Sequence, residues 1–303
     1  RTIAPGQSKF VEPNSNDDAL GAPGLADGKQ YAVTLSSDQP IAVVVNTHLD
    51  DVSIDHPVAY ATDGVTAGAA TLYGPYAAKN AQGIGRISTV VVQNTGAGAV
   101  TPSLAFTPLG NGPPQSFTAP AALAPGASWA FDPRFIGGAA STDASRLCGA
   151  AATSTCLGDG EYSFIASAPG GAIAAAVNVI SPLTAMGYTA SPSPAAKYFL
   201  PNVTRTLGGP AGWTTPILLQ SATATGATLQ WYRFSDGALA YTQTVAVPAG
   251  TAVRIDPLAQ ATLSDDTQYA VVVTGTGGTV SAIVVELAQG GDNAMIYEGF
   301  AAP

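Results

Sequence analysis

The hydrophobic residues of this chain occur in short runs separated by turns that contain glycine and proline. A run that begins with tyrosine is followed by a tight turn and then by a run of Ala, Val and Ile, and this order occurs three times. The paired runs are residues 31–35 and 41–46, 162–166 and 173–178, and 269–273 and 280–286. A final run in each set carries Tyr60, Tyr188 or Tyr297. Short apolar runs between such turns predict antiparallel hairpins of a sandwich or barrel.

A second repeated pattern precedes these hairpins. Residues 123–133 and 247–257, and less closely residues 3–13, each combine a Pro/Gly turn, a short run and an acidic residue followed by proline. The second and third sets also share an upstream half. Its matching runs are residues 72–76 and 198–202, 87–94 and 215–221, and 103–106 and 228–234. Each complete set is expected to hold roughly seven or eight strands in about 105–120 residues, the size of an immunoglobulin-like sandwich.

The repeats predict an all-β chain of tandem antiparallel β-sandwich modules, the first of them truncated. The expected modules are an N-terminal half module (residues 1–71), a complete sandwich with a cysteine loop (72–190) and a second complete sandwich (197–303). The Pro/Ser-rich linker 190–196 should be extended and fairly stiff. The first set has no upstream half, so four strands are expected where about eight make a sandwich.

An incomplete sandwich leaves an apolar face or a sheet edge uncovered. Three arrangements are open. The half module packs on the second module, the missing strands are removed during maturation, or a neighbouring copy supplies the cover by strand addition.

Composition narrows the class of protein. Charged residues are 10% of the 303 residues, and 34 Gly and 23 Pro argue against long helices, while 46% hydrophobic residues argue against disorder. A net charge of −9 with only 11 Lys and Arg disfavours binding to nucleic acid or to an anionic membrane. The longest apolar stretch, residues 170–188, is interrupted by polar residues and Pro182, so no membrane insertion is expected.

The chain has two cysteines, Cys148 and Cys156, in a segment rich in Gly, Ala, Ser and Thr. We expect a local disulfide that closes a surface loop, with two separate buried thiols as the alternative. A disulfide implies an oxidising compartment outside the cytoplasm. The start at Arg1, without an initiator Met or an apolar signal core, fits a processed chain whose targeting segment was removed.

These repeated motifs resemble the tandem immunoglobulin-like or adhesin-like β-sandwich arrays of secreted bacterial cell-surface proteins. The third set is the most typical, with aromatic and turn residues at 198–204, 212–215 and 231–237 and the Pro248–Pro257 turn and strand. The resemblance implies an extracellular, non-enzymatic role in surface coating, adhesion or fibre building. Turn and core residues specify a fold better than a function.

Catalytic chemistry has little support in the sequence. The only histidines are His48 and His56, and no Gly-x-Ser-x-Gly elbow is present. We expect no enzyme and no cofactor. Weak candidates for a metal site are Asn14, Asn16 and Asp18, and His48 with Asp50, but a polar turn or a solvated connection accounts for both segments more simply.

We therefore expect an extracellular structural protein, a subunit of a fibre, filament or layer built from copies of itself. The N-terminal half module would be completed head to tail by strand addition or by burial. The residues expected to carry assembly are Ile3, Phe10, Val11, Tyr31, Val33, Val43 and Val45. The alternative is an adhesin that binds surface glycans through exposed aromatic residues such as Trp213, Trp231, Tyr232 and Tyr241, without polymerisation.

Overall fold

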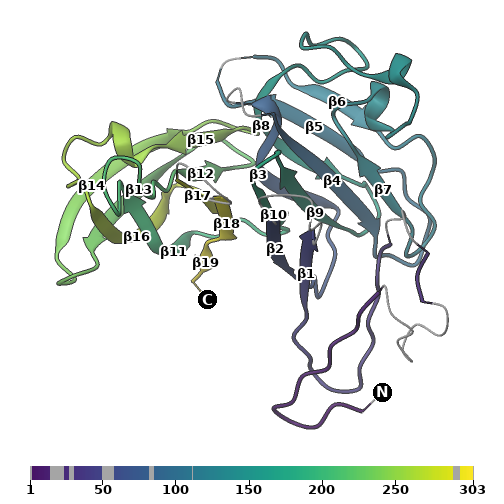
Figure 1. The fold of residues 1–303 in the computed structure, drawn as a ribbon, viewed down its shortest axis with the longest axis horizontal. Coiled ribbons are helices and arrows are strands. Elements are labelled where there is room, and N and C mark those ends of the chain that lie inside the picture. Colours follow the sequence, from purple (N-terminus) through teal and green to yellow (C-terminus); the bar gives the residue numbers. More distant parts are fainter. Residues whose placement is uncertain are drawn as a thin grey trace. The chain divides into compact units, whose positions relative to one another are not determined.

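The computed structural model describes residues 2–13, 24–26, 31–49, 58–81, 85–110, 112–288 and 294–302. The chain divides into two compact units, Arg1–Ser36 and Ser37–Pro303. The described residues of the first unit contain no strand, whereas the second unit is built of antiparallel strands joined by turns and loops (Figure 1). The prediction of an all-β protein is confirmed.

The strands described are β1 (Val44–Leu49), β2 (Val58–Asp63), β3 (Thr71–Ala81), β4 (Arg86–Asn94), β5 (Ser103–Pro108), β6 (Gln115–Thr118), β7 (Ser128–Phe131), β8 (Gly160–Ser167), β9 (Ile173–Ile180), β10 (Ala185–Thr189), β11 (Lys197–Arg205), β12 (Ile217–Gln220), β13 (Thr225–Arg233), β14 (Leu239–Val247), β15 (Ala252–Ile255), β16 (Thr267–Thr276), β17 (Ser281–Leu287), β18 (Ala294–Glu298) and β19 (Phe300–Ala301). Three short 3-10 helices are η1 (Ile136–Gly138), η2 (Ala144–Arg146) and η3 (Pro257–Ala259). Within the described residues, no helix has the length and apolar character needed to cross a membrane.

Strands β3–β10 and β11–β18 pair in the same order. The series β3, β8, β5, β6 in the first set corresponds to β11, β16, β13, β14 in the second. The series β7, β4, β9, β10 corresponds likewise to β15, β12, β17, β18. The repeated sequence pattern therefore folds into a repeated strand order.

The first set of strands surrounds its own apolar core. In the first set, β3 and β4 also pair at two positions, so all eight strands form one continuous sheet. Its two halves share this core, because Phe106 of β5 packs on Phe131 of β7 with ring centroids 5.0 Å apart. On β4, buried and half-buried residues alternate along the strand, as expected where one face meets the core.

The second set has a core of its own, in which Trp231 and Tyr269 of the five-stranded sheet meet edge to face. In the four-stranded sheet β15-β12-β17-β18, the two central strands β12 and β17 are buried on both faces. Leu219 and Val284 belong to the core of the second set, whereas Leu218 and Ile283 belong to that of the first. Strands buried on both faces read as continuous apolar runs, which explains the sequence of β12 and β17.

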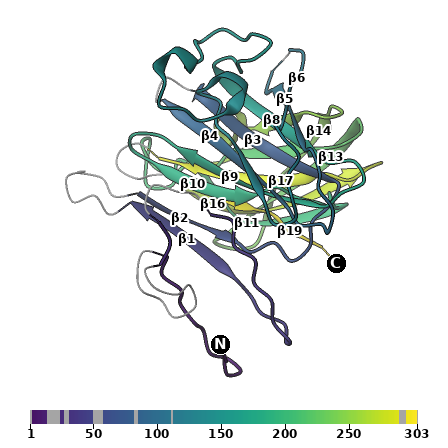
Figure 2. The same ribbon diagram turned by 90° about the vertical axis from the view of Figure 1, so that its right-hand side faces the viewer.

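The hairpin of β1 and β2 corresponds to the hairpins β9–β10 and β17–β18, as the repeat predicts. In each hairpin the second strand carries the repeated tyrosine, namely Tyr60, Tyr188 or Tyr297. The ring of Tyr60 lies over Gly187 of β10, where a Cβ atom would come within 2.4 Å of the ring. Figure 1 and Figure 2 both show β2 alongside β10.

Two runs that the sequence predicts as strands are not strands. Residues 31–35 and the run within residues 3–13 make no ladder, and β1 begins at Val44 rather than at Ile41. The strands that correspond to residues 31–35, β8 and β16, are each paired on both sides. Among the described residues of the N-terminal half, no such flanking strands are present, so the ladder cannot form. Conversely, the sequence pattern does not predict β6 and β14.

Candidate functional site

The tyrosines that recur in the sequence make two kinds of hydrogen-bonded contact, and each kind occurs in more than one set. The hydroxyl of Tyr188 donates to the carbonyl oxygen of Tyr76 and accepts its backbone N–H, at a bulge of β3. The hydroxyl of Tyr297 does the same with Asn202 at the bulge of β11. Burial raises the pKa of both hydroxyls, so they stay protonated and keep their donor role.

A second tyrosine contact occurs at the start of the tyrosine-led runs. The hydroxyl of Tyr269 accepts a hydrogen bond from the backbone N–H of Ser264, five residues upstream, at 2.8 Å. The same hydroxyl donates to the carbonyl oxygen of Ser264. Tyr31 makes the same pair of contacts with Ala26, at 3.0 and 3.3 Å and also five residues apart. The N-terminal half therefore keeps the local hydrogen bonds of the repeat although residues 31–35 form no strand.

The residues predicted to carry assembly are mostly exposed. Exposed fractions are 46% for Ile3, 70% for Phe10, 39% for Val11, 47% for Tyr31, 63% for Val33 and 51% for Val45, while Val43 is half-buried. Leu35, Ile41 and Val44, which the sequence pattern does not single out, are exposed as well. The first five lie in the unit Arg1–Ser36, and Val43 and Val45 lie on or beside β1 in the other unit.

The predicted disulfide between Cys148 and Cys156 is present, with Cα atoms 5.5 Å apart, and no free cysteine is found in the part of the chain described. It closes part of the long loop between β7 and β8, and the corresponding loop between β15 and β16 is much shorter. A disulfide of this kind is consistent with an oxidising, extracellular environment.

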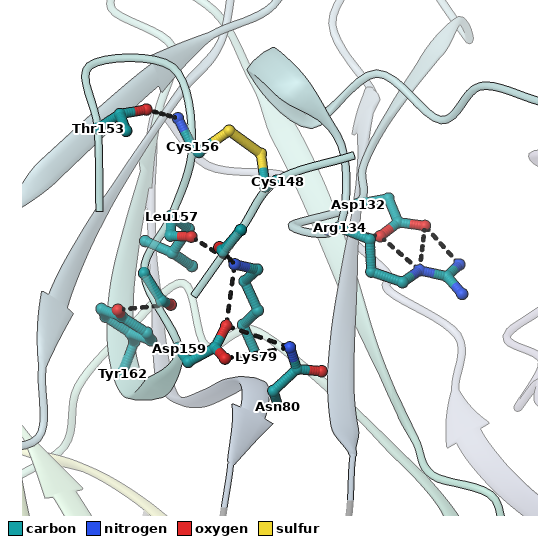
Figure 3. Close-up of polar contacts among 12 residues, drawn as sticks. Lys79, Asn80, Asp132, Arg134, Cys148, Thr153, Cys156, Leu157, Asp159 and Tyr162 are labelled. Carbon is teal, nitrogen blue, oxygen red and sulfur yellow. Dashed lines mark hydrogen bonds and ion pairs between the residues drawn. A yellow bond between two sulfur atoms is a disulfide. The ribbon is translucent and has the colours of Figure 1, made fainter. Parts of the chain in front are cut away.

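A buried lysine ties this loop to β3. Lys79 is 1% exposed, and its ammonium lies 2.9 Å from an Asp159 carboxylate oxygen (Figure 3). It also donates to the carbonyl oxygens of Gly149 and Leu157, each of which follows a cysteine. Asn80 donates to the same carboxylate. The three donors of the ammonium are thereby satisfied, which is what a buried cation requires.

The repeated Asp-Pro pair has a structural role in both sets. The Asp132 carboxylate accepts the backbone N–H of Arg134, and the Asp256 carboxylate accepts that of Leu258. The guanidinium of Arg134 also donates hydrogen bonds to both carboxylate oxygens of Asp132 (Figure 3). The acidic residue before proline thus stabilises the turn that follows it.

An ion pair links the two sets of strands. Glu161 of β8 lies 3.2 Å from Arg254 of β15 and accepts the hydroxyl of Tyr76 at 3.0 Å. Burial raises the pKa of Tyr76 well above its ordinary value. In addition, the Gln220 amide donates to the carbonyl oxygen of Phe164. The sequence singles out none of these residues, because isolated charges on strands carry no recognisable pattern.

Of the candidate metal ligands, only His48 lies within the described residues. Asn14, Asn16, Asp18 and Asp50 lie outside the described residues, and His48 is an exposed residue of β1. Across the described ranges, no group of three or more His, Cys, Asp or Glu side chains is arranged to hold a metal ion.

Comparisons with known proteins give no family. No protein-family model matches the chain, and no curated protein matches it in sequence. Among solved structures, the chain is similar to the crystal structure of Thermotoga maritima 1070, with 9% sequence identity and a TM-score of 0.31. The match covers 36% of this chain and 97% of that chain. A likeness at this level carries no argument about function.

The aromatic residues that the sequence suggests for sugar binding differ in their exposure to solvent. Trp231 is fully buried in the core of the second set, so it offers no stacking face, whereas Trp213, Tyr232 and Tyr241 are half-buried. Other aromatic residues line a cleft of about 550 Å³, which lies between the end of β2, the start of β3 and the C-terminal strands β18 and β19. Its walls include Tyr73, Tyr198, Tyr297, Glu298 and Phe300.

Proposed function

We propose that this protein is an extracellular structural subunit that assembles with copies of itself into a filament, fibre or layer. Assembly takes place through the N-terminal half, which a neighbouring copy completes by strand addition or covers by burial. The protein has no catalytic role in this assembly and needs no cofactor for it.

The observation that carries the proposal is the state of residues 31–35. They keep the tyrosine contact of the repeat, yet they form no strand and expose Tyr31, Val33 and Leu35. In β16, the corresponding strand, Tyr269, Val271 and Val273 are at most 1% exposed. Burying one such side chain is worth about 1.5–3 kcal/mol, so several exposed together favour a partner.

Self-association can be tested by static light scattering over a wide concentration range. The average molar mass of the wild-type protein should rise with concentration. The double variant Phe10→Ser, Val33→Ser should show a smaller rise. The matched control is Leu258→Ser, which removes an apolar side chain that is 50% exposed in η3. A wild-type chain that stays monomeric at every concentration, with residues 2–49 resistant to protease, contradicts the proposal.

The cleft lined by Tyr73, Tyr297 and Phe300 favours a second candidate, a glycan-binding adhesin. Aromatic faces with a neighbouring carboxylate, here Glu298, are suited to stacking and orienting a sugar. Binding on a glycan array that is lost in Phe300→Ala, or in Trp213→Ala among the aromatic residues that the sequence suggests, would favour the adhesin over the assembly subunit.

A further inference from the structure

Strand β14 presents a free edge in the five-stranded sheet. The sheet order is β14-β13-β16-β11-β19, so only one side of β14 is paired. Its nine residues include no charged residue, no glycine and no proline. Natural proteins protect free edges with lysine, proline, bulges or short strands. β14 is irregular only at its start, where Ala240 has no register partner on β13. Its residues 241–247 pair without interruption and carry none of these protective features, which makes them suited to accept another strand.

Strand β1 presents the second free edge. Its counterparts β9 and β17 each pair on one side with the second strand of their hairpin and on the other with β4 or β12. β1 pairs with β2 alone, and no strand among the described residues takes the place of β4 or β12. The repeat thus indicates what covers this edge, namely an antiparallel strand.

The other free edges fit β1 less well. β6, β7 and β15 have four residues each, β10 and β18 have five, and β19 has two. The outer edge of β11 holds β19 and contains Pro201, and β2, with six residues, carries the charged Asp63. The seven uninterrupted residues 241–247 of β14 outnumber the six residues of β1, so they can pair along the whole of that strand. β1 is also free of Asp, Glu, Lys and Arg, so no charge repulsion opposes the pairing.

We propose that the free edge of β1 in one copy pairs antiparallel with the free edge of β14 in the next copy. This inference rests on the proposed function and names the surface that completes it. β1 and β14 lie far apart within the unit Ser37–Pro303 in both views (Figure 1, Figure 2) and do not pair with each other. A head-to-tail contact between two different surfaces is heterologous, and its repetition builds an open filament where the rotation between copies does not close into a ring.

The pairing can be tested by site-specific crosslinking between two single-cysteine variants of the full chain. Asn46→Cys places a thiol on β1, and Thr244→Cys places one on the exposed face of β14. Because both native cysteines are in a disulfide, a short bismaleimide reacts with the new thiols. The mixture of the two variants should give a covalent dimer, and each variant alone should not. A dimer formed equally by either variant alone indicates a symmetric contact and overturns the pairing.

A second pair of variants separates this inference from the proposed function. Thr242→Lys with Thr244→Lys adds the charges that natural edge strands use, at exposed positions of β14. It should raise the concentration needed for assembly by about tenfold or more. The control, Ala222→Lys with Thr223→Lys in an exposed turn, should not. If wild type assembles and the β14 variant assembles equally well, the pairing is wrong while assembly stands. If wild type never assembles, both are wrong.

Discussion

The buried Lys79 offers a sharp test of how the cysteine loop is held. In Lys79→Met the side chain keeps its length but loses all three hydrogen bonds, to Asp159 and to the carbonyl oxygens of Gly149 and Leu157. Removing one partner of a buried ion pair costs about 3–5 kcal/mol. Because Asp159 is 31% exposed and can be rehydrated, we expect the lower end of that range, about 3 kcal/mol.

The assay is urea unfolding of the oxidised protein, followed by tryptophan fluorescence, since Trp129 lies in the core of the first set. The control is Lys197→Met, which removes an exposed lysine of β11 that lies over the Phe199 ring and should cost less than about 1 kcal/mol. Adding Asp159→Asn to Lys79→Met should cost little more, because the partner is already lost. A loss below about 1 kcal/mol for Lys79→Met would refute the role assigned to this lysine.

Three further predictions concern the loop, the N-terminal hairpin and a buried carboxyl group. Replacing both Cys148 and Cys156 by Ser opens a short loop and should lower the free energy of unfolding by about 2–3 kcal/mol, measured by urea unfolding; an unchanged midpoint would contradict this. Gly187→Ala should push the Tyr60 ring away from β10 and speed hydrogen exchange in β2, whereas Gly98→Ala, with open space around it, should not; equal exchange in both variants would refute the contact. Burial raises the pKa of Glu286, so its ionisation opposes folding as pH rises through that pKa. Glu286→Gln should therefore stabilise the protein at about pH 7, with a gain that shrinks towards about pH 4; urea unfolding at both values checks it, and a gain independent of pH would contradict it.

Much of the fold could be predicted from the sequence because it repeats. The Gly/Pro turns, the alternating runs and the repeated tyrosines predict the positions along the chain of most strands from β3 to β18. The strands β6 and β14 could not be predicted. Their sequences contain Thr and Gln, do not resemble each other, and show no strong alternation of apolar and polar residues. For residues 31–35 the prediction of a strand was wrong. Their pattern is that of a strand, but strand formation also depends on neighbouring strands outside the run.

The candidate site could be predicted only in part. Cys148 and Cys156 could be identified because two cysteines close together in a polar loop, with no histidine nearby, are suited to pair with each other. Lys79, Asp159, Glu161 and Arg254 could not, since each depends on contacts between residues far apart in the chain. The free edge of β14 is likewise a property of the sheet order, which no local pattern records.

Electron microscopy of the purified, oxidised full chain over a range of concentrations tests the proposed assembly most directly. We predict filaments or layers in which neighbouring copies are joined through the N-terminal half, and their loss in the Phe10→Ser, Val33→Ser variant. Uniform single-chain particles at every concentration would contradict the proposal.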